Sequence, residues 1–134
     1  PAPTAFIYEN QHQGTWDPSA FLTVPASIQF QQDHDWDAVR ARCRKLNRET
    51  RNRIYDIIDT EPICPNTEEW LGQMASIIIN IENGLDFKWR LMDEYKLEMP
   101  VFPWGDKILF RISFNAYNDE KDADRLIEVL CDVY

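Results

Sequence analysis

One arginine in the middle of an apolar strand is the residue of this sequence best suited to bind an anion. In the segment 108–114 every second side chain, from Ile108 to Phe114, is large and apolar, and Arg111 lies on the opposite face. A guanidinium is always charged, and its planar set of donors fits a carboxylate or a phosphate. Two interpretations follow: an anion anchor on a rigid strand, or an arginine on a solvated or ion-paired sheet face. The strand alone favours neither.

The histidines and cysteines form no recognisable catalytic or metal-binding pattern. The histidines are His12 and His34, and His34 falls in a break between helices, where acid–base chemistry is one interpretation. No serine or cysteine nucleophile pattern accompanies it, so a surface or helix-end histidine is favoured. Cys43, Cys64 and Cys131 are widely spaced, without a CxxC pair or a Cys/His cluster. We therefore expect reduced, mostly buried thiols and no metal site.

The length, net charge and hydrophobic runs of the chain limit the kinds of partner that it can bind. The chain has 134 residues, which suggests one domain, and its net charge is −9. The acidic balance disfavours nucleic acid or an anionic membrane surface as the main partner. No apolar run reaches the ~18 residues of a membrane span, and no signal-peptide pattern is present. We expect a cytoplasmic protein that begins in a linker of a longer chain.

Hydrophobic periodicity predicts the order helix, helix, strand, helix, strand, strand, helix. The helices are expected at 18–32, 36–58, 85–96 and 119–132, and the strands at 74–79, 98–102 and from 107. Residues 1–16 are expected to be an extended lead-in, and 17–134 one domain. The expected fold class is α+β: a small, three-stranded, mainly antiparallel sheet with helices packed on one face. The face with Arg111 is left free, which suggests that a second domain or subunit covers it.

Three details of the helices are predicted. Asp17 is expected to cap the first helix and Pro25 to kink or divide it. Asn118 is expected to cap the last helix. Basic residues cover one side of the second helix, and we interpret them as a solvated face, not a nucleic-acid site, because acidic residues are interleaved. They are Arg40, Arg42, Arg44, Lys45, Arg48, Arg51 and Arg53.

Two segments together resemble a known family. The segment 13–21, QGTWDPSAF, resembles the Gly-Thr-x-Asp-Pro-Ser segment of the class V aminotransferases, and 111–118, RISFNAYN, resembles the Arg-x-Ser-x-x-x-Tyr-Asn segment near their C-terminus. The segments 34–39, HDWDAV, and 95–101, YKLEMPV, also resemble the isopenicillin-N epimerase-like branch. The resemblance covers nearly the whole chain in the right order.

This resemblance implies the C-terminal small domain of a fold type I enzyme that uses pyridoxal 5′-phosphate (PLP) and is a homodimer. It implies that Arg111 binds the substrate α-carboxylate. Tyr117 and Asn118 close the Arg111 loop and are candidates to lie beside the substrate. From the residues themselves, Tyr117 is expected to be packed. Gly14 and Thr15 are implied to contact the cofactor phosphate of the neighbouring subunit. Many relatives carry Arg where this chain has Trp16, so a third anion contact is not implied there.

The Schiff-base lysine of such enzymes is not expected in this chain. All five lysines fall on predicted helix faces or at a hairpin end, in polar surroundings: Lys45, Lys88, Lys96, Lys107 and Lys121. No catalytic residue is therefore assigned. We expect the large PLP-binding domain to be missing, and the chain alone to be inactive and to lose PLP on dialysis.

The reaction of the whole enzyme stays open between epimerisation, transamination and lyase or desulfurase chemistry on an amino acid. The alternative is a stand-alone α+β binding module without catalysis, whose partner would use the acidic surface and the free sheet face. An upstream coding region long enough for a large domain would favour the enzyme, and a start codon at Pro1 would favour the module.

Overall fold

The computed structural model describes residues 4–11 and 14–134. The chain divides into two compact units, of which the first extends to Trp36 and the second is Asp37–Tyr134. In the described part of the chain, no helix is long and apolar enough to cross a membrane.

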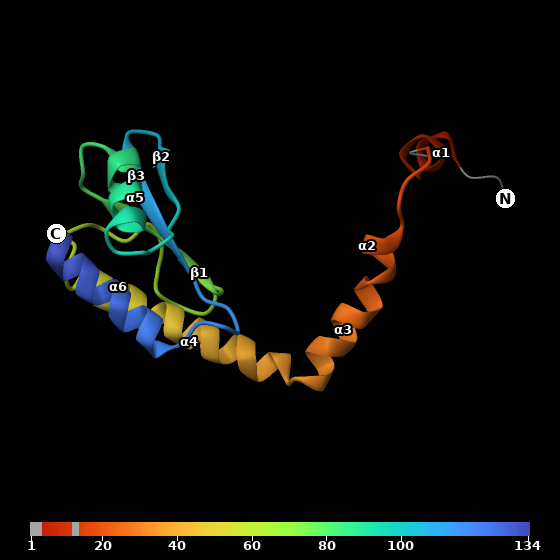
Figure 1. Ribbon diagram of the computed structural model, residues 1–134, viewed down its shortest axis with the longest axis horizontal. Helices are drawn as coiled ribbons and strands as arrows, with labels where there is room; N and C mark the ends of the chain where they lie inside the picture. Colours follow the sequence, from red (N-terminus) through yellow and green to blue (C-terminus); the bar gives the residue numbers. More distant parts are fainter. Residues whose placement is uncertain (1–3, 12–13) are drawn as a thin grey trace. The chain divides into compact units, whose positions relative to one another are not determined.

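The first unit contains three short helices (Figure 1): α1 (Ala5–Gln11), α2 (Ser19–Leu22) and α3 (Val24–Asp33). The helix α1 corrects the expectation of an extended lead-in. The predicted first helix is divided between α2 and α3 at Thr23, because Pro25 occupies the first turn of α3, where a missing N–H costs nothing. Asp17 does not cap α2, whose N-cap is Pro18; its carboxylate accepts the Ser19 N–H at 2.9 Å.

Three helices and three strands make up the second unit. They are α4 (Trp36–Tyr55), β1 (Met74–Ile79), α5 (Gly84–Asp93), β2 (Val101–Trp104), β3 (Lys107–Ser113) and α6 (Glu120–Val133). The sheet has the order β1-β3-β2, and both pairs are antiparallel. This confirms the predicted α+β class and the predicted hairpin between the last two strands. The hairpin turns at Gly105, whose φ of +61° favours glycine.

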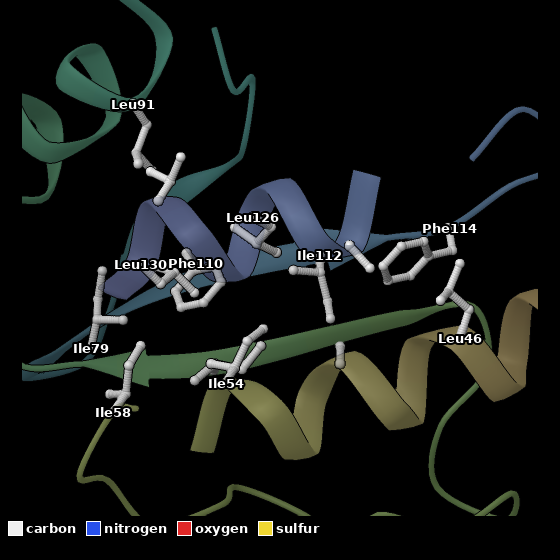
Figure 2. Packing of buried hydrophobic residues seen from close by; sticks show 14 of the residues in the cluster. Leu46, Ile54, Ile58, Ile79, Leu91, Phe110, Ile112, Phe114, Leu126 and Leu130 are labelled. Carbon is white, nitrogen blue, oxygen red and sulfur yellow. The ribbon is translucent and has the colours of Figure 1, made fainter. Parts of the chain in front are cut away.

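Helices cover one face of this sheet (Figure 2). Phe110 and Ile112 of β3 point between α4 and α6, where they pack with Ile54 and Leu126. Phe110 is 1% exposed and Arg111 is exposed, as the predicted alternation requires. Because side chains alternate along a strand, Arg111, which stands between Phe110 and Ile112, must point away from this core. Leu109, on the same face as Arg111, is nevertheless buried at 3% exposed, so the face expected to be free is free only in part.

The basic side of α4 is not solvated throughout. Arg51 is fully buried, which corrects the expectation for this residue. Its Nη2 donates to the Cys64 carbonyl at 2.7 Å, so it holds the segment after α4 against the helix. Helical periodicity cannot show this, because a non-repetitive segment covers that side of α4.

Candidate functional site

Arg111 lies where the sequence analysis expects it, on the sheet face away from the helices. It is opposite Ser76 of β1, and its own N–H donates to the Pro100 carbonyl at 3.0 Å on the other side. Its backbone is therefore paired to both neighbouring segments, which makes the Cα position rigid. The side chain is exposed, and among the described residues its guanidinium has no hydrogen-bond or ion-pair partner. A charged group that is fixed at its base and free at its tip suits an external anion.

A cavity of about 450 Å³ opens beside this arginine. It lies where β3 ends and α6 begins, and the segment 97–100, which leads into β2, forms its other wall. Its lining residues are Met74, Leu97, Glu98, Met99, Pro100, Arg111, Ile112, Ser113, Phe114, Tyr117, Asn118, Asp122 and Leu126. The structure thus brings together the three candidate substrate-binding residues: Arg111, Tyr117 and Asn118.

Tyr117 lies on the loop between β3 and α6. It is 84% exposed, so the expectation that it is packed is wrong. The reason is local: the loop turns outward after Phe114, which is the last core residue of the strand. The phenol is available at the cavity wall.

Asn118 does not cap the last helix, contrary to expectation. Asp119 is the N-cap of α6, in a capping box with Asp122. The Asn118 amide instead closes its own loop, since its Oδ1 accepts the Asn115 N–H at 3.0 Å and its Nδ2 donates to Asp122 at 3.1 Å. The Asp119 carboxylate accepts the Lys121 and Asp122 N–H groups at 2.9 and 3.3 Å, which are the bonds of an N-cap.

Arg42 of α4 binds the loop between β3 and α6 through two backbone carbonyls. Its Nη1 donates to the Asn118 carbonyl at 2.9 Å, and its Nη2 donates to the Ala116 carbonyl at 3.2 Å. Sequence reasoning missed this role because the two carbonyls lie 76 and 74 positions further along the chain. Only the packing of α4 beside the start of α6 places them within reach.

The predicted cofactor-phosphate residues belong to the first unit. Gly14 has φ +76°, and a Cβ added there would have no atom within 4 Å. Thr15 is exposed next to it. The two residues thus offer backbone N–H groups and a hydroxyl that an anion can approach. Gln13 lies outside the described residues.

The remaining candidates contribute nothing further to a catalytic site. His34 follows α3 as its C-cap, stacks on Phe30 and contacts the Phe30 carbonyl through Nδ1 at 2.7 Å. It is thus a helix-end histidine, as favoured from the sequence; His12 lies outside the described residues. The thiols are free, but only Cys43 of the three is buried, which corrects the expectation of mostly buried thiols; Cys64 is half-buried and Cys131 exposed. Within residues 4–11 and 14–134, no cluster of His, Cys, Asp or Glu could hold a metal ion.

The sequence of this chain is similar to those of two known enzymes. The isopenicillin N epimerase of Amycolatopsis lactamdurans is 32% identical over 121 residues, covering 88% of this chain and 30% of that protein. The chain is similar to the isopenicillin N epimerases. The enzyme of that name from Streptomyces clavuligerus is 30% identical over 121 residues, with the same coverage.

These findings confirm the resemblance to the isopenicillin-N epimerase-like branch. The chain spans about 30% of the length of the epimerases it matches. No protein-family model matches the chain.

Proposed function

We propose that this chain is the C-terminal domain of a PLP-dependent, epimerase-like enzyme acting on an amino acid, and that Arg111 anchors the substrate carboxylate. The unpaired, exposed guanidinium at the wall of a 450 Å³ cavity is the observation that supports this proposal most strongly. The similarity to two isopenicillin N epimerases supports the reaction type. In this proposal the enzyme is a homodimer and its large domain lies outside the matched 30%.

Arg111 would bind the carboxylate through two parallel N–H···O bonds. The geometry of the fork fixes the orientation of the carboxylate as well as its position. Tyr117 and Asn118 would form the wall beside it, and Arg42 keeps their loop in place. Because β3 pairs on both sides, the backbone at Arg111 is already ordered when the substrate arrives, so only the side chain pays an entropic cost on binding.

Gly14 and Thr15 fit a contact to the cofactor phosphate. A glycine with positive φ and no neighbour near its Cβ position lets an anion approach the backbone, and the exposed Thr15 hydroxyl adds a donor. In the proposed homodimer this contact reaches the neighbouring subunit. When bound, PLP would supply the electron sink that makes the proton on the substrate Cα removable.

The test is Arg111→Ala in an enzyme that contains this chain. Loss of a bidentate anchor should cost about 2–4 kcal/mol of substrate binding. That corresponds to a KM raised roughly 30- to 700-fold, at about tenfold per 1.4 kcal/mol. The PLP absorbance should survive dialysis unchanged.

Two controls sharpen this test. Arg111→Lys keeps the charge but not the fork, and should recover only part of the affinity. Arg125→Ala removes an equally charged residue of α6 that pairs with Glu128 outside the cavity, and should leave KM unchanged. If Arg111→Ala and Arg125→Ala had equal KM values, Arg111 would not be part of the substrate site.

A further inference from the structure

A second free charge lines the same cavity as Arg111. Glu98 lies on the segment leading into β2, and its side chain is exposed. In the part of the chain that the structure describes, its carboxylate has no hydrogen-bond or ion-pair partner, and it does not pair with Arg111. The cavity therefore presents a free cation and a free anion to whatever enters it.

The other carboxylate of the cavity is already engaged. Asp122 accepts hydrogen bonds from the Asn118 amide at 3.1 Å and from the Asp119 N–H at 3.2 Å. It belongs to the capping box that starts α6. Glu98 is thus the carboxylate that can accept a donor from a ligand without breaking a bond of the fold.

The cavity also offers apolar contacts, beside polar groups from Ser113, Tyr117 and Asn118. The aliphatic and aromatic side chains there belong to Met74, Leu97, Met99, Phe114 and Leu126. Methionine side chains adapt to unbranched chains of different length. Such a lining suits the methylene groups of a linear side chain, with polar groups at its two ends.

We propose that Glu98 makes this cavity selective for amino acids whose unbranched side chain ends in a positively charged group. The inference rests on the proposed function, since Arg111 must hold the carboxylate for the far end to reach Glu98. An ammonium about 4 Å from a solvated carboxylate gains roughly 1 kcal/mol in water and somewhat more at a partly shielded site. The expected preference over an uncharged side chain is therefore about 5- to 10-fold.

Lysine and norleucine test this preference, because both have a linear side chain of four carbons and only lysine ends in a charge. Binding of each to the ¹⁵N-labelled 134-residue chain is followed by NMR titration at pH 7. The quantity compared is the ratio of the norleucine Kd to the lysine Kd. The net charge of −9 favours any cation, so the ratio is also measured in variants that differ in charge.

Glu98→Gln should reduce this ratio by about 5- to 10-fold while norleucine still binds. Glu61→Gln makes the same change of charge at an exposed residue outside the cavity, and should leave the ratio as in the parent chain. Equal ratios in Glu98→Gln and Glu61→Gln would overturn the role of Glu98.

Arg111→Ala separates this inference from the proposed function. If the anchor is correct, this variant loses affinity for lysine and norleucine alike. If both affinities are unchanged, or the parent chain binds neither amino acid at 100 mM, the carboxylate anchor fails and the role of Glu98 fails with it. Loss of both affinities in Arg111→Ala with an unaltered ratio in Glu98→Gln would leave the proposed function standing and reject the selectivity.

Discussion

Replacing Arg42 by alanine should loosen the loop that carries Tyr117 and Asn118. The substitution removes two charge-assisted hydrogen bonds, at 2.9 and 3.2 Å, to the carbonyls of Asn118 and Ala116. Hydrogen bonds to a charged group contribute about 1.5–3 kcal/mol each. Arg42 is exposed, so solvent screening reduces this contribution. We expect the unfolding free energy to fall by about 1–2 kcal/mol for the pair.

Urea denaturation measures this loss, and hydrogen exchange locates it. The amides of residues 115–118 should exchange faster in Arg42→Ala, while those of β3 stay protected. Arg42→Lys can bond only one carbonyl well and should recover less than half of the lost stability. Arg44→Ala is the matched control, because Arg44 is exposed on the same helix and has no hydrogen-bond or ion-pair partner among the described residues. Equal denaturation midpoints for Arg42→Ala and Arg44→Ala would refute the reasoning.

Three further substitutions test the packing of the second unit. Asp119→Ala removes the capping box of α6 and should lower the unfolding free energy by about 1 kcal/mol in urea denaturation, with faster exchange in the first turn; an unchanged midpoint would contradict the assigned cap. Gly84→Ala puts a Cβ 2.9 Å from Ile108 Cγ2, and should lower the midpoint by the equivalent of about 1–3 kcal/mol unless the hairpin shifts. Burial raises the pKa of Tyr134 above its ordinary value near 10, against the smaller lowering by the Asn80 N–H. Because the unfolded phenol ionises first, the stability from Tyr134 is complete below pH 10 and lost as the pH rises through the raised pKa. Tyr134→Phe should therefore give a flatter stability curve above pH 10, and an equally steep curve would reject the assignment.

The sequence predicts β1 and β3 well because their signals are local, whereas the strand expected at 98–102 is β2 at Val101–Trp104. The strand predicted at 74–79 has the bounds of β1, and the alternation correctly assigns Phe110 to the core face and Arg111 to the other. It does not predict that Leu109 and Ile78, on the Arg111 face, are buried too. Period-two alternation is decisive where one face of a strand is buried, since a shift by one residue would expose every apolar side chain. Pro25 likewise marks the division between α2 and α3, because its effect on the backbone is independent of tertiary context.

The errors concern residues whose environment is made by distant segments. The burial of Arg51 depends on the Cys64 carbonyl, and the role of Arg42 on carbonyls of the β3–α6 loop. The choice of Asp119 over Asn118 as cap is decided by the path of the chain after β3. In each case the residue type is compatible with two environments, and the packing of a distant segment against the residue decides which of the two occurs. The cavity itself has the same origin, since its walls come from four separated segments.

The absence of an ion-pair partner for Arg111 among the described residues can be compared with the net charge of the protein. Acidic residues outnumber Lys and Arg by 23 to 14, so carboxylates are common on the surface, although the exposed Arg44 pairs with none among the described residues. Arg48 and Arg53 each pair with a carboxylate oxygen at 2.8 Å. Arg111 does not, although Glu98 lines the same cavity. Surface ion pairs are weak, so a free pair of opposite charges costs little. It leaves both groups ready for a ligand that carries the complementary charges, and this explains best why a rigid strand presents an unpaired cation in an acidic protein.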